Sequence, residues 1–314
     1  GERGIRETLR HLGELEAFGL KAHAGLGIDR HAALRPRAVA VKGASVLLSA
    51  IGIGAGSHRA GEGRPGQLLY AASEDFSAVV ARLAQTEGAY RILSVHYGDE
   101  LQVMPDAADV RKLRDQAVKE AGIDLVVGHH AHVAAGVQEI EGRLVFYGLG
   151  NFLHLGMQDM QSFGLCRDYG LLARLHLGRG KDGRYSARAI EALPLAGMHA
   201  RTERMPAQQA TARIHVLNHL AGRLDDAAAR ARGVRFTPQP DGTGLYCAAG
   251  AAEDGGRIGA LCREWREPAA PSDALARQIA ASCGSTYVSA ARRQQVGAQA
   301  KAKSTNPFSG IFGF

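Results

Sequence analysis

The sequence predicts an α/β fold whose sheet carries histidines at the ends of its strands. Helical and strand patterns alternate between residues 73 and 127, as is typical of α/β domains. Later segments read as hairpins, so we expect much of the sheet to be antiparallel. Two apolar runs, at residues 93–96 and 124–132, end in histidines. Because strand ends lie at the rim of a sheet, these runs predict a functional site there.

The first elements expected along the chain are a helix and a hairpin. Residues 5–18 have an apolar face at helical spacing and are followed by Gly19, which predicts a helix. Residues 32–36 fit a short helical turn that proline ends. Strands are expected at residues 38–41 and 45–51, because the lysine–glycine pair between them is typical of a hairpin turn.

Two helix–strand units come next. Residues 73–87 read as a helix with Ser73 as the N-cap, and residues 91–96 read as the following strand. A second helix is expected from residue 106 or 109 to residue 120, before a strand at residues 124–127. The order of helix, strand and polar side chains therefore occurs twice.

The second half of the chain begins with hairpins and ends without clear periodicity. Strands are expected at residues 137–140, 144–147, 170–177 and 184–192, and a helix at residues 206–224. The periodicity weakens after residue 233, and the last two dozen residues contain arginines and lysines but no acid. We expect a domain at residues 1–200, a helical or irregular C-terminal extension at 201–285, and a flexible basic tail at 286–314.

The composition is compatible with an anionic ligand but gives no indication of nucleic-acid recognition. The chain has 314 residues, a net charge of +7 and a pI near 9.4, and its basic residues are scattered. No uncharged apolar run reaches about eighteen residues, and the first residues are not a signal peptide. The four cysteines, Cys166, Cys247, Cys262 and Cys283, show no C-x-x-C spacing. The sequence is therefore compatible either with one disulfide or with free thiols.

Three histidines form the predicted site. His130 and His132 lie two residues apart just past one strand, and His96 ends another. Neutral imidazoles suit zinc, iron, nickel or manganese, so the three predict a metal site or contacts to a phosphate. A single strand-end histidine is more often a packing residue, but three together favour a site. His129 points the opposite way if the strand continues, and is the weaker candidate.

Polar residues beside the histidines add further candidates. Asp99 and Glu100 follow His96 and could orient it or accept a proton from bound water, although solvated loop carboxylates explain them equally well. Asn151 lies in a turn, where it could donate to a phosphate or simply stabilise the turn. No G-x-S-x-G elbow, P-loop or dinucleotide fingerprint occurs, so covalent serine catalysis and nucleotide binding lack support.

Three motifs resemble those of the poly-γ-glutamate capsule synthesis protein (CapA) family, a branch of the calcineurin-like metallophosphoesterase superfamily. The matching segments are 96–100 (HYGDE for H-[WY]-G-x-E), 128–133 (GHHAHV for G-H-H-P-H-V) and 146–152 (FYGLGNF, whose last six residues match the Y-S-L-G-N-F turn). The general similarity covers residues 1–195. The chain departs from the pattern at Ala131, where proline is usual, and at Gly148, where serine is usual, and neither change removes a ligand.

The resemblance implies a four-layer α/β/β/α sandwich with two metal ions that hold a hydroxide for attack on phosphorus. The roles it implies are metal binding for His96, His130 and His132, catalysis for His96, His130 and Glu100, and substrate binding for Asn151 and His129. The expected cofactors are divalent manganese, iron or zinc, two in the full-length protein. Family members have a strand and an N-N-H segment before the first helix, so we expect this chain to begin inside the domain, without its first strand or strands.

Three functions of different classes stay open at this point. They are a metal-dependent phosphoesterase-type hydrolase of capsule or poly-γ-glutamate biosynthesis, a non-catalytic subunit for polymer assembly or export, and a metal-dependent hydrolase of γ-glutamyl polymer. The expected partners are an anionic polymer or phosphorylated small molecule and membrane synthase or export subunits, with no specific nucleic acid. The expected location is the cell envelope, with an upstream anchor, and a cytoplasmic location stays open.

Overall fold

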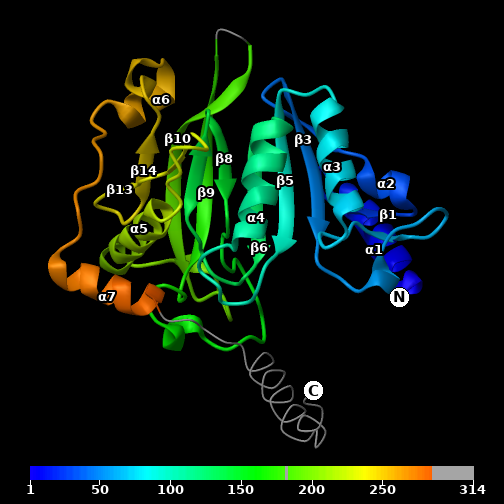
Figure 1. Ribbon diagram of the computed structural model, residues 1–314, viewed down its shortest axis with the longest axis horizontal. Coiled ribbons are helices and arrows are strands. Elements are labelled where there is room, and N and C mark those ends of the chain that lie inside the picture. The colour runs from blue at the N-terminus through cyan, green and yellow to red at the C-terminus, as the bar shows by residue number, and fades with distance from the viewer. Residues whose placement is uncertain (181–182, 285–314) are drawn as a thin grey trace, which may run out of the picture.

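A computed structural model of the protein describes residues 1–180 and 183–284 (Figure 1). Its helices are α1 (Glu2–Glu16), α2 (Arg30–Leu34), α3 (Ser73–Gln85), α4 (Ala107–Val110), α5 (Ala207–Gly222), α6 (Gly256–Cys262) and α7 (Asp273–Gly284). The helix α4 continues directly into the π-helical segment η2 (Arg111–Glu120). Short 3-10 turns are η1 (Gly56–His58), η3 (Met160–Phe163) and η4 (Ala251–Glu253).

A seven-stranded sheet forms the centre of the molecule. Its order is β12 (Ala231–Gly233), β7 (Val137–Ile140), β8 (Arg143–Phe146), β6 (Leu125–His130), β5 (Tyr90–Tyr97), β3 (Ala44–Gly52) and β2 (Arg37–Val41). The four central strands, from β8 to β3, are parallel to one another, and the outer ones pair antiparallel. The predicted helix-then-strand order is confirmed, because α3 precedes β5 and η2 precedes β6.

A second, five-stranded sheet is antiparallel. Its longest strand, β10 (Tyr185–Ala196), pairs with β9 (Gly170–Arg179) along one edge. The other edge of β10 pairs with β14 (Gly244–Cys247) and β11 (Glu203–Arg204), and β14 pairs with β13 (Thr237–Pro238). The remaining strands, β1 (Leu26–Gly27) and β4 (Gly66–Gln67), form a small ribbon of their own.

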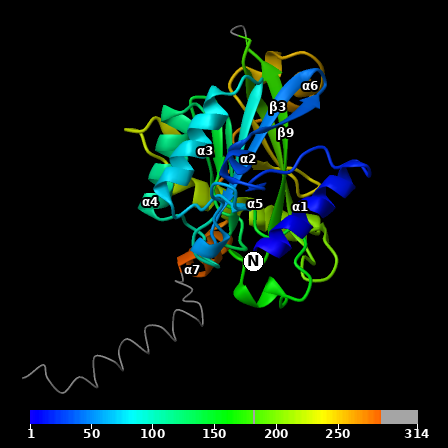
Figure 2. The same ribbon diagram turned by 90° about the vertical axis from the view of Figure 1, so that its right-hand side faces the viewer.

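The two sheets and their helices form the α/β/β/α arrangement that the family resemblance implied. Helices α3 and η2 cover the outer face of the large sheet, where Phe76, Leu93 and Leu113 are buried together. The inner faces of both sheets share a core that includes Phe146 and Ile190. The segment containing η4 and α6 covers the outer face of the small sheet, and α5 packs against strands of both sheets (Figures 1 and 2).

The C-terminal region is more regular than its weak periodicity predicted. Its strand β14 lies inside the small sheet, and all four of its residues are buried. A strand that is buried on both faces has no alternation of apolar and polar residues, so its sequence carries no strand signal. The predicted extension at residues 201–285 thus contributes strands as well as helices, whereas the tail predicted at 286–314 lies outside the described residues.

All four cysteines are paired in two disulfides. Cys166 pairs with Cys283, 117 residues away, and Cys247 pairs with Cys262, 15 residues away. The sequence left one bridge and free thiols open, because spacing alone does not determine pairing. The longer bridge joins the end of α7 to the loop before β9, so α7 is tied to the body of the molecule.

Helix α1 lies at the surface, where every one of its residues keeps part of its side chain exposed. Leu15 is 49% exposed, and Phe18, just beyond the helix, is 86% exposed.

Within residues 1–180 and 183–284, no helix is long and apolar enough to cross a bilayer.

Candidate functional site

The histidines of the predicted site lie at the carboxyl ends of β5 and β6. These strands are parallel, and their register places His96 beside His129 and Tyr97 beside His130. On β5, Leu93 and Tyr97 point to the core under α3, so His96 points to the opposite, inner face at the rim. The alternation places His129 on this inner face too, whereas His130 would point outward if the strand simply continued.

A left-handed backbone turn brings His130 to His96 instead. His130 has a backbone φ of +84° and His132 a φ of +60°, values that residues other than glycine rarely adopt. The Nδ1 atom of His130 consequently lies 3.1 Å from Nε2 of His96. Such backbone strain costs about 1–3 kcal/mol per residue and tends to occur at functional sites. The expected convergence of the two histidines is therefore present in the structure.

His132 faces a second set of polar groups. Its Nδ1 lies 2.7 Å from Oδ1 of Asn151, and the Asn151 amide donates to Sδ of Met157 at 3.1 Å. The ring of His154 meets that of His132 edge to face, with centroids 5.2 Å apart. We did not anticipate His154, and its only signal in the sequence is its place three residues after Asn151.

Glycines make the turn that presents Asn151. Gly150 has φ of +67°, and a Cβ atom there would come within 2.8 Å of the carbonyl oxygen of Tyr169. A side chain at this position would therefore strain the backbone and clash with the start of β9. The close approach explains why a Gly-Asn turn occurs at this rim.

Partial desolvation favours the uncharged form of three of these imidazoles. It lowers the pKa of His96, and the neighbouring His130 lowers it further. Burial likewise lowers the pKa of His130, against the opposing effect of Glu100, and lowers that of His129. Near neutral pH these rings are therefore neutral, which leaves a nitrogen lone pair for a metal ion or a proton.

The carboxylates sit at the solvent side of the site. Asp99 and Glu100 are exposed in the turn after β5. The negative charge of Glu100 raises the pKa of His130, against the effect of burial, so the carboxylate lies near that histidine. This placement suits an approach of Glu100 to a ligand held by His96 and His130, but leaves its predicted catalytic role a prediction.

The pair of His96 and His130 fits a metal ion by its nitrogen separation. Two imidazole nitrogens bound to one tetrahedral metal at the usual bond length of about 2.05 Å lie about 3.3 Å apart. The observed 3.1 Å is close to this value, and it is also the length of an N–H···N hydrogen bond between the two rings. In the part of the chain that the structure describes, however, no three His, Cys, Asp or Glu side chains are gathered as a metal would require. The ring centroid of His132 lies 6.1 Å from that of His130, so its role as a third ligand stays a prediction.

The sandwich with histidines at the ends of its central strands is an α/β fold of the metallophosphoesterase-like class. The sequence profile of the bacterial capsule synthesis protein family (PGA_cap) matches residues 1–155, which contain every histidine of the site. These residues belong to that family, as the three motifs predicted.

Two curated relatives match parts of the chain. The PGA biosynthesis protein CapA of Bacillus subtilis (strain 168) is 31% identical over 100 residues, which are 32% of this chain and 24% of the relative. The capsule biosynthesis protein CapA of Bacillus anthracis is 32% identical over 62 residues, or 20% of this chain and 15% of the relative. The matches thus span a quarter or less of either relative.

One solved structure, of a hypothetical protein from Thermus thermophilus, aligns with 55% of this chain and 62% of its own at 15% identity. Its TM-score of 0.29 is too low to support an argument.

Proposed function

We propose that this protein acts in the biosynthesis of a bacterial capsule polymer, of the poly-γ-glutamate type, at the cell envelope. The support is the family to which residues 1–155 belong and the functions named for the two CapA relatives. The two disulfides are in keeping with this location, because disulfides persist in oxidising compartments outside the cytosol.

We further propose that the histidine site is a metal-dependent site of the phosphoesterase type. The observation that carries this proposal is the contact of His96 with His130, made through a strained backbone turn at the ends of two parallel strands. These two rings would bind the first metal ion, and His132 would complete the ligand set. A bound divalent ion such as manganese, iron or zinc supplies a Lewis acid and a more acidic water.

The other residues of the site then have defined tasks. Asn151 holds the Nδ1 side of His132, so the opposite ring nitrogen, Nε2, is the one that is directed toward a ligand. Glu100, which is exposed beside His130, would accept a proton from the attacking water. His129, partly buried beside His96, would contact the substrate at the inner face.

The substrate class is a phosphorylated intermediate or the anionic polymer itself. A hydrolase of γ-glutamyl bonds would use the same residues, whereas a subunit for assembly or export would need no turnover. Membrane synthase or export subunits are the protein partners that the assembly or export role would imply.

Hydrolysis of bis(p-nitrophenyl) phosphate by the full-length gene product with added Mn²⁺ tests the proposed site. We expect metal-dependent turnover that His130→Ala lowers by about a hundredfold or more, a size typical of the loss of a group that acts on the reacting atoms. The control is His31→Ala, an exposed histidine on α2. Equal turnover of the two variants would contradict the assignment of the site.

A further inference from the structure

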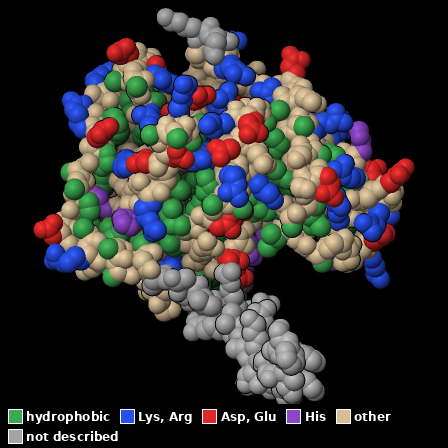
Figure 3. All heavy atoms as spheres, viewed as in Figure 1, with side chains coloured by type: hydrophobic (Ala, Val, Ile, Leu, Met, Phe, Trp, Pro, Cys, Tyr) green, Lys and Arg blue, Asp and Glu red, His purple; other side chains and the backbone are tan. Residues whose placement is uncertain are grey.

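A buried arginine, Arg167, joins the C-terminal part of the chain to the histidine site. It lies in the loop between η3 and β9, beyond residues 1–155 that match the family, and it is only 4% exposed. Surface charge gives no comparable signal on the face in Figure 3, where basic and acidic side chains of the described residues are interspersed. Because arginine is almost never buried without hydrogen-bond partners, the contacts of Arg167 indicate its role.

The guanidinium of Arg167 donates to two backbone carbonyl oxygens that are far apart in the sequence. Its Nε donates to the carbonyl oxygen of Leu101 at 3.0 Å, and its Nη1 donates to that of Ser282 at 2.9 Å. Leu101 lies in the turn after β5, and Ser282 lies in the last turn of α7. Since the guanidinium is rigid and planar, it fixes these two segments relative to each other.

Leu101 in turn contacts the backbone of the histidine turn. Its N–H donates to the carbonyl oxygen of Ala131 at 2.7 Å. Ala131 lies between His130 and His132, so its peptide groups belong to the turn that directs both rings. Two hydrogen bonds in series therefore connect Arg167 with this turn.

The conformation of Leu101 depends on such support. Its φ is +62°, in the left-handed region that favours glycine. A residue in this region keeps its conformation only where the surrounding structure holds it. Leu101 is held on both sides, at its N–H by Ala131 and at its carbonyl oxygen by Arg167. Because Glu100 directly precedes Leu101, the same bonds also restrain the backbone that carries this carboxylate.

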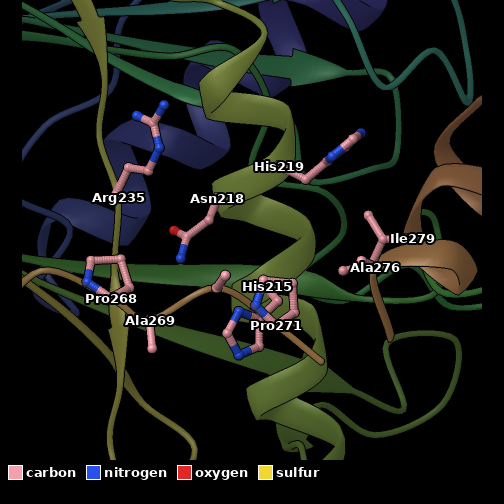
Figure 4. A pocket seen from close by; sticks show the side chains of 10 residues that line it. His215, Asn218, His219, Arg235, Pro268, Ala269, Pro271, Ala276 and Ile279 are labelled. Atoms are coloured by element: carbon pink, nitrogen blue, oxygen red, sulfur yellow. The ribbon is translucent and has the colours of Figure 1, made fainter. Parts of the chain in front are cut away.

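The other end of the connection is anchored in α7. Cys283, next to Ser282, forms a disulfide with Cys166, which directly precedes Arg167. The N–H of Cys166 also donates to Oγ of Ser282 at 3.0 Å. Figure 4 shows Ile279 of α7 facing α5 across a hollow of about 320 Å³, and this side chain is 1% exposed. Arg167 therefore extends from a segment whose position is fixed by a covalent bond and by core packing.

We propose that Arg167 is a positioning residue for the histidine site, which holds the turns at residues 98–101 and 130–132 in the conformation that a ligand meets. It acts through the backbone of Leu101 and Ala131 rather than on the ligand. The positioning role rests on these contacts alone, whereas its consequence for metal binding rests on the proposed function.

Amide hydrogen exchange of the full-length gene product without added metal tests the positioning role. In Arg167→Met the carbonyl oxygen of Leu101 loses a charged donor. We therefore expect peptides covering residues 97–103 and 128–133 to exchange about tenfold faster or more. Arg167→Lys keeps a charged donor but lacks the rigid fork that reaches two carbonyl groups, so its exchange should be intermediate.

Two further variants separate positioning from general stability. Arg114→Lys is the matched control, because Arg114 is 12% exposed and pairs with Asp115 and Asp226 on η2, at the outer face of the large sheet. It should leave exchange in both peptides unchanged. Ser282→Ala removes the acceptor for the N–H of Cys166 but keeps the side chain of Arg167, so it should speed exchange in the same peptides by a smaller factor. This milder variant decides the question if the Arg167 variants do not fold.

The affinity for Mn²⁺ tests the consequence for the site. It can be measured from the electron paramagnetic resonance signal of free Mn²⁺. We expect Arg167→Met to bind Mn²⁺ about tenfold more weakly, a loss typical of residues that orient metal ligands from behind. Arg114→Lys should bind Mn²⁺ like the unchanged protein.

The outcomes distinguish this proposal from the proposed function. Equal exchange of the two peptides in Arg167→Met and the unchanged protein would overturn the proposal. Equally faster exchange throughout the molecule, including α3, would also overturn it, because it would show a general loss of stability. Unchanged Mn²⁺ affinity despite faster exchange of the two peptides would overturn the role at the site. If the unchanged protein binds no Mn²⁺, the proposed function fails, and the exchange result still decides whether Arg167 holds the two turns.

Discussion

Replacing Asp75 by asparagine should destabilise the protein far more than replacing the neighbouring Glu74 by glutamine. The Asp75 side chain is fully buried and accepts hydrogen bonds from Arg59 at 2.9 and 3.0 Å, from Arg30 at 3.1 Å and from the N–H of Leu69 at 3.1 Å. In Asp75→Asn an amide donor would face guanidinium donors, and two arginines would lose their counter-charge.

The expected magnitude follows from the exposure of the partners. Removing one member of a buried ion pair costs about 3–5 kcal/mol. Because the side chains of Arg30 and Arg59 are 35% and 29% exposed, solvent screens part of the loss, so we expect about 3 kcal/mol. Glu74 is the matched control, since it lies on the same helix and pairs with Arg59 at 2.6 Å but is 59% exposed. Glu74→Gln should cost much less than Asp75→Asn, because solvent screens an exposed ion pair.

Urea unfolding followed by circular dichroism measures both variants, with the free-energy change taken from the midpoint shift at equal slope. The effect should also depend on pH. Burial raises the pKa of Asp75, but the bonds from Arg59, Leu69 and Arg30 outweigh it and lower the pKa below its ordinary value of about 3.9. The stabilisation is therefore complete above that pH and is lost as the pH falls through the lower folded-state pKa. A cost for Asp75→Asn no larger than that for Glu74→Gln would refute this reasoning.

The remaining predictions concern the disulfides, the site and the core. On the loop-entropy argument, replacing Cys166 and Cys283 by alanine should lower the free energy of unfolding by about 5 kcal/mol. Replacing Cys247 and Cys262, which close the shorter loop, should lower it by about 3 kcal/mol. Equal losses in urea unfolding would contradict that argument. Gly128 lies just before His129 and His130, and a Cβ there would overlap the carbonyl of Tyr147. Gly128→Ala should therefore lower the free energy of unfolding by about 1–3 kcal/mol and reduce metal binding. Unchanged metal affinity would show that this packing does not position the histidines. Phe76→Ala should cost about 3–5 kcal/mol in thermal or urea unfolding, since the ring is 1% exposed, and a cost under about 1 kcal/mol would show that the core under α3 collapses to fill the space.

Much of the central fold was predictable, because each of its elements has a local signal. The alternation of helix and strand from residue 73 to β6 and the Lys42-Gly43 hairpin turn both appear in the structure. By contrast, β14 is buried on both faces and carries no alternation, so its place beside β10 was not foreseeable. Pairing of distant strands and cysteines depends on the assembled fold, which local patterns do not encode.

The candidate site, like the fold, was predictable only in part. The sequence places His96 and His130 at the ends of two strands, and the structure brings them into contact. Simple alternation would have turned His130 to the other face, and only the left-handed turn reverses this direction. His154 was missed because its place three residues after Asn151 does not by itself mark it as a neighbour of His132.

Metal analysis tests the central claim most directly. The full-length gene product would be compared with the triple variant His96→Ala, His130→Ala, His132→Ala and with the control His31→Ala. We predict about two transition-metal ions per chain in the unchanged protein and the control, as in two-metal hydrolases, and their loss in the triple variant. An unchanged protein without transition metal, or a triple variant that keeps it, would contradict the account.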